Sequence, residues 1–281
     1  MAAPVSAIGE QKIDCHCHVF DPANFPYRED VSYRPSGQEI GTAAQFGALC
    51  EAYRVEHALL VGPNSGYGED NRYLLHAIAH GGGRFKGVAV VANDASEGLL
   101  ADLKRQGIVG ITLNATFHGV DYYRNMRPLI RRLLELDLFL QIQVEGDQLI
   151  GLAPLIENSD VRIIVDHCGR PIPDRALSQA GFAMLCALGR SGRAAVKLSG
   201  LAKFSQMAFP HEDAWPYVHA LADAFGLDRC LWGSDWPFLR APQRMDYGPL
   251  LSLVDRLFPD PVARRKLLWS TPRRLFGFGT A

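Results

Sequence analysis

The sequence has little of several features that would assign it to common classes of protein. It contains six cysteines in 281 residues, which is too few for a disulfide scaffold, and most of them lie in apolar runs where a free thiol behaves as a small hydrophobic group. It also has no surplus of charge, because 29 basic and 30 acidic residues leave a formal net charge of −1. We therefore expect no partnership with nucleic acid or with an anionic membrane.

Long apolar segments are absent as well. No apolar run approaches the roughly 20 residues that a membrane-spanning helix needs, and the N-terminus lacks the basic start and apolar stretch of a secretory signal. We therefore expect a cytoplasmic protein whose residues 1–11 are a disordered lead-in. The apolar fraction of 48% is enough for a large core, and the length suits one domain over residues 1–281.

What the chain does have is eight apolar runs of strand length with helical patterns between them, such as the apolar face within residues 122–136. Eight such units predict a (β/α)8 TIM barrel, and an open doubly wound sheet is the alternative. Long connections at 21–38 and 236–247 follow the first and last strands, at the end where catalytic loops of a barrel lie. The predicted strands cover residues 13–20, 58–62, 87–91, 110–115, 139–144, 162–168, 194–199 and 230–234.

The first predicted strand ends in the sequence Asp-Cys-His-Cys-His, with histidines at His16 and His18. Because side chains alternate along a strand, both imidazoles should face the barrel interior, while Cys15 and Cys17 face the helices. This separation disfavours a zinc knuckle built from both residue types. Two incidental histidines are the other alternative, but polar rings that point into an apolar barrel need a reason.

Two further clusters close the sixth and eighth strands. Asp166-His167 ends an apolar run, and by itself it is equally well explained by a capping aspartate and a core histidine. Asp235 follows Gly-Ser and precedes Trp-Pro, which is also typical of a turn. All three clusters lie at the C-terminal ends of their strands, and closure of a barrel would bring Asp235 close to His16 and His18.

With these residues the chain resembles the amidohydrolase superfamily, and within it the amidohydrolase-related lactonase branch that includes the 2-pyrone-4,6-dicarboxylate and L-fuconolactone hydrolases. The matching stretches are IDCHCHVFDP, FPYREDVSYRPSG, VDHCGRP, VKLSGL and LWGSDWP. The resemblance implies a hydrolase for a small polar lactone, used in catabolism of sugar acids or aromatic rings. It implies that Asp235 takes a proton from water and that His16, His18 and His167 polarise the lactone carbonyl.

The sequence departs from metal-dependent members of the superfamily. The fifth predicted strand has glutamines and no histidine, and the fourth has neither lysine nor glutamate, so a binuclear metal site is not expected. We expect that no cofactor is required, as the lactonase branch implies. A single Zn²⁺ remains the alternative, and its ligands would be His16, His18, His167 and Asp235.

The substrate is less well defined by the sequence. Where the pyrone-dicarboxylate lactonases use arginines, this chain has Thr112 and His118, so a hydroxylated sugar lactone is favoured over pyrone-dicarboxylate. Gln141 and Gln143 should share a face, with Gln143 nearer the rim. Lys197 is equally well explained as a structural lysine. The predicted substrate-binding residues are Tyr33, Arg34, Asn114, Gln143, Arg170, Lys197 and Trp236.

Three other functions remain open. A metal-dependent decarboxylase or a lactone isomerase could use the same groups, and a barrel without catalytic activity could only bind a ligand. Apart from the small-molecule substrate, the sole partner we expect is a second copy of the chain in a possible homo-oligomer.

Overall fold

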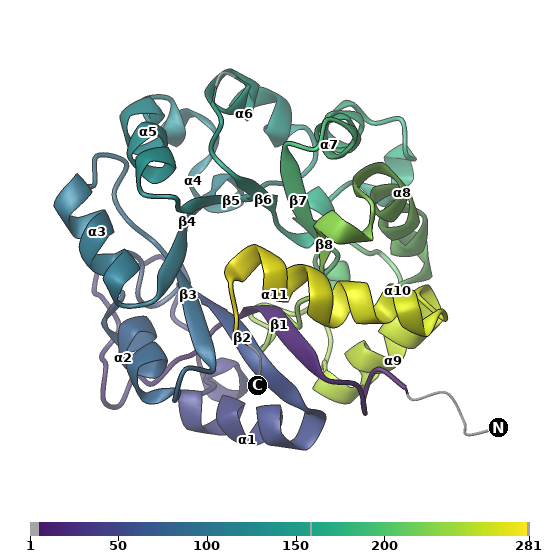
Figure 1. The fold of residues 1–281 in the computed structure, drawn as a ribbon, viewed down its shortest axis with the longest axis horizontal. Coiled ribbons are helices and arrows are strands. Elements are labelled where there is room, and N and C mark those ends of the chain that lie inside the picture. Colours follow the sequence, from purple (N-terminus) through teal and green to yellow (C-terminus); the bar gives the residue numbers. More distant parts are fainter. Residues whose placement is uncertain (1–5, 158, 280–281) are drawn as a thin grey trace.

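The computed structural model describes residues 6–157 and 159–279. Its eight strands form one parallel sheet in the order β1 to β8, surrounded by helices (Figure 1). All eight predicted strands are confirmed, with shifted ends. They are β1 Lys12–Cys17, β2 Val55–Val61, β3 Phe85–Ala89, β4 Ile108–Asn114, β5 Phe139–Gln143, β6 Ile163–Val165, β7 Ala194–Lys197 and β8 Cys230–Leu231.

Helices follow the strands in alternation. The predicted helix at 122–136 is α5, which begins with a proline in its first turn, where the missing N–H costs nothing. None of the helices in the described ranges combines the length and apolar character needed to cross a membrane. The helices are α1 Ala43–Tyr53, α2 Arg72–His80, α3 Glu97–Arg105, α4 Ala115–His118, α5 Arg127–Glu135, α6 Gln148–Ile156, α7 Ala180–Arg190, α8 Trp215–Phe225, α9 Tyr247–Leu257, α10 Pro261–Arg265 and α11 Thr271–Phe276.

The sheet closes on itself between β1 and the segment after β8. The backbone N–H of Asp235 donates to the carbonyl oxygen of His16 at 2.8 Å, and the backbone N–H of His18 donates to the carbonyl oxygen of Trp236 at 2.7 Å. Closure pairs the first strand with the last, so the fold is a (β/α)8 TIM barrel and the open sheet is excluded.

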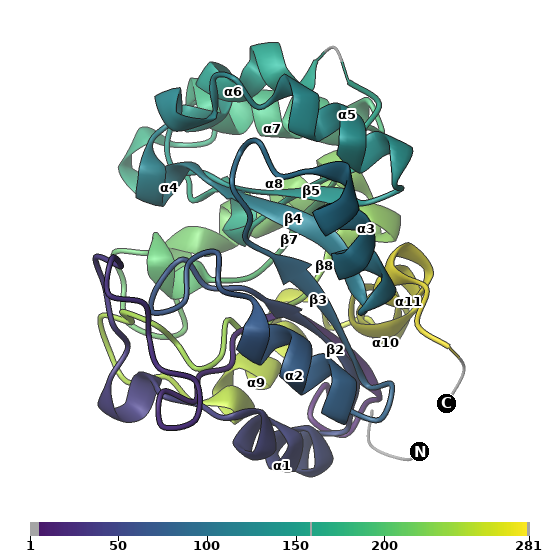
Figure 2. The ribbon, with the colours of Figure 1, turned by 90° about the vertical axis from the view of Figure 1, so that its left-hand side faces the viewer.

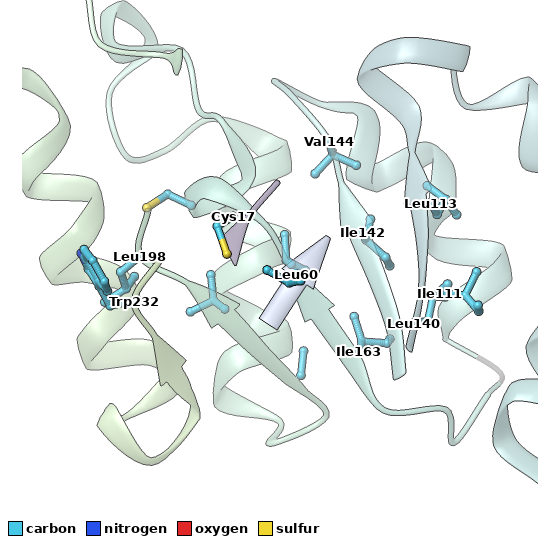
Figure 3. Packing of buried hydrophobic residues seen from close by; sticks show 14 of the residues in the cluster. Cys17, Leu60, Ile111, Leu113, Leu140, Ile142, Val144, Ile163, Leu198 and Trp232 are labelled. Atoms are coloured by element: carbon cyan, nitrogen blue, oxygen red, sulfur yellow. The ribbon is translucent and has the colours of Figure 1, made fainter. Parts of the chain in front are cut away.

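Alternate residues of the strands face the surrounding helices. On β5, Leu140 and Ile142 belong to the apolar layer between the strands and the helices, whereas the alternating Gln141 and Gln143 face inward. Figure 3 shows this outer layer at close range. Its labelled members are Cys17, Leu60, Ile111, Leu113, Leu140, Ile142, Val144, Ile163, Leu198 and Trp232.

The N-terminal end of the barrel is filled by apolar side chains. Inward residues such as Ile13 and Leu231 pack with Trp269, Phe276 and Phe278, which come from the C-terminal segment. Figure 2 shows this segment, with α10 and α11, at the end of the barrel opposite the long loops. Only the C-terminal end of the barrel, where the long loops lie, is therefore free to form a functional site.

The prediction of a disordered lead-in over residues 1–11 needs correction in its second half. Residues 1–5 lie outside the described residues. Ala7 is buried and its N–H donates to the carboxylate of Asp255 at 2.8 Å, while Glu10 accepts two hydrogen bonds from the buried Arg264. These contacts hold residues 6–11 against α9 and α10. They could not be predicted from local pattern, because the partner residues are 248 and 254 positions away.

Candidate active site

A cavity of about 520 Å³ opens at the C-terminal end of the barrel. Its wall takes residues from the ends of β2, β4 and β5 and from the segments after β6, β7 and β8. The predicted site residues that line it are His18, Asn114, Gln143, His167, Arg170 and Asp235. His16 lies just below, almost completely buried.

One carboxylate oxygen is the meeting point of the site. The Oδ1 atom of Asp235 faces the Nε2 atoms of three imidazole rings, at 3.6 Å from His18, 3.7 Å from His167 and 3.8 Å from His16. The four residues that the sequence predicted to form the site are therefore brought together. These distances exceed a hydrogen bond, so a small molecule or an ion can be held among the four groups.

Backbone irregularities place these side chains. The pairing of β1 with β2 shifts register between Asp14 and Cys17, and the Asp14 carboxylate accepts hydrogen bonds from the backbone N–H groups of His16 and Ser234. Because of this bulge, Cys15 packs inside the barrel next to His16, whereas Cys17 packs outside. The prediction that both cysteines face the helices is thus wrong for Cys15, since strict alternation fails at a bulge.

The two residues that follow β6 and β8 adopt unusual conformations. His167 has φ 50° and Asp235 has φ 61°, a left-handed region that costs a side-chain-bearing residue about 1–3 kcal/mol. Gly200 allows the close packing beside His167, because a Cβ on this glycine would lie 2.4 Å from the ring Nδ1. Backbone strain of this kind is typical of residues in active sites and ligand-binding sites.

Lys203 is a site residue that the sequence reasoning missed. Its ammonium lies 3.3 Å from Oδ2 of Asp235 and lines the cavity. Burial alone would raise the pKa of the Asp235 carboxyl, but Lys203 and the histidines outweigh it and hold this pKa well below its usual value. Only its place just after the seventh strand, on the catalytic side, could have drawn attention to it.

Two of the histidines, His16 and His167, are by contrast held neutral. Burial, aided by the charge of Lys197, lowers the pKa of His16 to about 4. Burial also lowers the pKa of His167 well below its ordinary value. At neutral pH the site therefore combines an ionised Asp235 carboxylate with the neutral imidazoles of His16 and His167.

A buried polar layer lies directly under His16. Lys197, Asp166 and Gln141 have no exposed surface, and the Gln141 amide donates to Asp166 Oδ2 at 2.8 Å. Lys197 lies 3.0 Å from Asp166 Oδ1. Lys197 and Gln141 therefore lie below the cavity and do not line it, so the predicted substrate contact of Lys197 and the paired glutamine wall are not found.

The rim contributes further polar groups. The side-chain oxygen of Asn114 accepts hydrogen bonds from the Thr116 hydroxyl and from the backbone N–H of Phe117, and so caps the start of α4. The Gln143 amide donates to the Thr116 hydroxyl. Arg170 has a buried Nε without a hydrogen-bond partner among the described residues. Arg240 also lines the cavity and was not predicted.

Three predicted contacts are not found at the cavity. Trp236 packs against Phe46 of α1, with ring centroids 5.1 Å apart, so its ring lies on the outer side of the barrel. Arg34 is exposed and donates to backbone carbonyls of its own loop. Tyr33 bonds Glu39, and it reaches the rim only indirectly because the guanidinium of Arg240 lies over its ring.

The same residues could hold a metal ion. His16, His167 and Asp235 each offer a ligand atom, and the three atoms lie within 4.8 Å of one another. Zn²⁺ takes imidazole nitrogen and carboxylate oxygen at about 2.0–2.2 Å, so the ligand atoms of one tetrahedral ion lie roughly 3.3–3.6 Å apart. The Nε2 atoms of His16 and His167 lie 3.8 Å and 3.7 Å from Asp235 Oδ1, so the three groups would have to move slightly inward to hold a single ion. β5 supplies no histidine to this site.

Histidines and an aspartate at the C-terminal ends of parallel barrel strands lie where barrel enzymes carry their catalytic residues. Residues 13–278 match the amidohydrolase family, and the chain belongs to it.

Named relatives include lactone hydrolases that match nearly the whole chain. The chain is 34% identical to a 4-sulfomuconolactone hydrolase of Rhizobium radiobacter, over 98% of this chain and 93% of that one. It is 27% identical to a 2-pyrone-4,6-dicarboxylate hydrolase of Comamonas testosteroni, over 94% and 89%. The crystal structure of a putative 2-pyrone-4,6-dicarboxylic acid hydrolase from Pseudomonas putida superposes with a TM-score of 0.84 at 29% identity, covering 96% of this chain and 99% of the other.

Proposed function

We propose that this protein is a lactonase that hydrolyses a small, polar, anionic lactone. The observation that carries the proposal is the Asp235 carboxylate, which Lys203 keeps ionised while three imidazoles face it across a polar cavity. Relatives that cover nearly the whole chain are named as lactone hydrolases, which supports the same reaction here.

The proposed chemistry assigns one task to each group. Asp235 takes a proton from a water molecule, whose oxygen attacks the lactone carbonyl carbon. His16, His18 and His167 stabilise the negative charge that develops on the carbonyl oxygen. When the ring C–O bond breaks, the leaving oxygen receives the proton from Asp235, so the carboxylate is restored and the product is an open hydroxy acid.

The charges of the cavity favour an anionic substrate. Arg170, Lys203 and Arg240 all line it, and the opposing charges are Glu145 and the ionised Asp235, so one positive charge is in excess. Guanidinium groups bind carboxylates and related anions through paired hydrogen bonds, and the buried Nε of Arg170 has no partner among the described residues. The polar Thr112, Asn114 and Gln143 remain suited to hydroxyl groups, so a carboxylated sugar lactone satisfies both features.

We propose further that the reaction needs no metal ion. A single Zn²⁺ is the alternative, favoured by the proximity of His16, His167 and Asp235; when bound there it would polarise a carbonyl or a water. That alternative would also suit the metal-dependent decarboxylase. A lactone isomerase or a ligand-binding barrel without catalysis would need no metal either.

The first experiment is a pH-indicator screen of carboxylated, sulfonated and neutral lactones, with as-purified and chelator-treated protein. Turnover of charged lactones that survives chelation supports the proposal. Activity that is lost on chelation and restored by Zn²⁺ favours the metal-dependent reaction. Binding of lactones without turnover favours the ligand-binding barrel, and release of CO₂ favours the decarboxylase.

The setting of the enzyme is part of the proposal. All six cysteines are buried and unpaired, which suits a reducing cytoplasm. We propose that residues 1–281 act as one domain, and a homo-oligomer stays a prediction.

A further inference from the structure

The two histidines of the first strand differ in what holds the far side of their rings. Nδ1 of His18 lies 2.7 Å from the backbone carbonyl oxygen of Val61. Nδ1 of His16 lies 3.1 Å from the ammonium nitrogen of Lys197. One partner can only accept a hydrogen bond and the other can only donate one.

These partners require opposite states of Nδ1 in the two rings. His18 must carry a proton on Nδ1 to donate to the carbonyl of Val61. His16 must accept at Nδ1 from Lys197, which leaves its proton on Nε2. In general, the hydrogen bond made by one ring nitrogen determines the state of the other.

The ammonium of Lys197 is itself firmly held. It donates to Gln141 Oε1 at 2.6 Å and lies 3.0 Å from Asp166 Oδ1. The opposite arrangement would have His16 donate from Nδ1 to Asp166 Oδ1, which is 3.4 Å away. That arrangement would point the N–H close to an ammonium that has no lone pair to receive it, so the shorter contact with Lys197 decides the tautomer.

The other side of the His16 ring awaits a partner. Its Nε2 is buried without a hydrogen bond among the described residues, and the nearest carboxylate oxygen, on Asp235, is 3.8 Å away. A buried N–H without a partner is costly, and an acceptor that enters the site, such as a carbonyl oxygen, would satisfy it.

We infer that Lys197, held by Asp166 and Gln141, is a positioning residue that keeps His16 as an Nε2–H donor toward the substrate carbonyl and withholds its lone pair from a metal ion. The inference rests on the proposed function for its catalytic meaning. A slight inward movement would bring the ligand atoms to distances that suit Zn²⁺, but the ligand atom of His16 carries a proton in the arrangement that Lys197 imposes. A metal ion would need this proton to move to Nδ1, in conflict with Lys197.

The first test measures the tautomers directly in the unmodified protein. The ring-nitrogen chemical shifts of His16 and His18, measured by NMR and assigned with His16→Gln and His18→Gln variants, distinguish protonated from unprotonated nitrogens. We expect the proton on Nε2 in His16 and on Nδ1 in His18. A proton on Nδ1 of His16 at neutral pH would overturn the inference, whether or not any lactone is hydrolysed.

The second test compares Lys197→Met with Lys12→Met. Lys12 is a matched control because it is also a fully buried lysine, on β1, but its ammonium bonds the backbone carbonyls of Ile8 and Tyr53 away from the cavity. In Lys197→Met we expect Zn²⁺ affinity, measured by competition with a chromogenic chelator, to rise at least about ten-fold. We expect kcat in the presence of chelator to fall about 10–100-fold, with a smaller change in KM.

The Lys12→Met variant should change neither Zn²⁺ affinity nor the ratio of kcat to KM. Unchanged Zn²⁺ affinity in a folded Lys197→Met variant, or an equal rise in both variants, would overturn the inference. If Lys197→Met does not fold, the tautomers of the unmodified protein decide. Both binding and NMR measurements are made without a lactone, so an inactive lactone screen would contradict the proposed function and leave the inference standing.

Discussion

The two ends of the barrel are built from the same strands but serve opposite purposes. At the N-terminal end, inward residues such as Ile13 and Leu231 pack against Trp269 and Phe276 in a closed apolar cluster. At the C-terminal end the same strands lead into histidines, carboxylates and lysines around a cavity of about 520 Å³.

The comparison shows how the fold separates stability from chemistry. The buried charge of Asp235 and the left-handed backbone at His167 and Asp235 each cost free energy. The apolar end contributes free energy without such costs, at roughly 25 cal/mol for each Å² of apolar surface buried. A change at one end should therefore alter activity with little loss of stability, and a change at the other end should do the reverse.

The largest effect that would test this separation is expected from Asp235→Asn. Removal of the base should lower kcat about 10²–10⁴-fold, measured on the substrate that the lactone screen identifies, while the thermal unfolding midpoint changes little. The exposed Asp246→Asn is the control and should keep full activity. Loss of stability in proportion to loss of rate would contradict the separate roles.

The converse change is Phe276→Ala in the apolar end. Deletion of this buried ring, which packs on Phe139 with centroids 5.5 Å apart, should lower the free energy of unfolding by about 3–5 kcal/mol. Urea unfolding measures this loss, and kcat of the folded variant should stay within about two-fold. Phe209→Ala, at an exposed ring, should cost far less. A large fall in kcat would show that the two ends are coupled.

Acid should destabilise the polar end first. An unfolded histidine takes up a proton below pH about 6.5, whereas burial lowers the pKa of folded His16 to about 4. The unfolded state therefore binds more protons between these values, and stability present above pH 6.5 should fall by about 3 kcal/mol as pH decreases to 4.

Urea unfolding between pH 7 and pH 4 tests this slope. The variant His16→Gln should have a flatter slope, because it removes one of the groups that titrate. An identical slope in the variant would assign the acid sensitivity to other residues.

The smallest expected effect comes from Lys203→Gln. Loss of the ammonium beside Asp235 should raise the pKa of this carboxyl, because the opposite charge that lowers it is gone. The acid limb of the pH profile of kcat/KM should therefore move to higher pH. Lys266→Gln, which removes a surface lysine paired with Asp228, should leave the profile in place. A profile that does not move would exclude Lys203 from control of the base.

Much of the fold and of the candidate site could be predicted from the sequence, for local reasons. Apolar runs of strand length mark parallel strands that are covered on both faces, and the C-terminal ends of barrel strands meet on one rim. That rule alone was enough to place His16, His18, His167 and Asp235 together. Gln143 and Arg170 at the cavity also followed from their positions near strand ends.

The remaining site features depend on irregular backbone. Cys15 faces inward because of a bulge in β1, Trp236 turns outward onto Phe46, and Lys203 reaches Asp235 from a turn after β7. A bulge or a loop conformation is determined by contacts from distant parts of the chain, such as those of Asp14 with Ser234. Local pattern does not carry that information.

The sequence by itself determined the eight strands, the end at which the site lies and the four groups that meet there, because period-two alternation and strand-end position are properties of a local segment. Closure of the sheet into a barrel was decided by the contacts of β1 with the segment after β8. Only the tertiary structure decided what those groups are able to do. The charge of Lys203 beside Asp235 and that of Lys197 beneath His16 depend on distances of about 3 Å, and the pKa of a carboxyl or the tautomer of an imidazole depends on such distances.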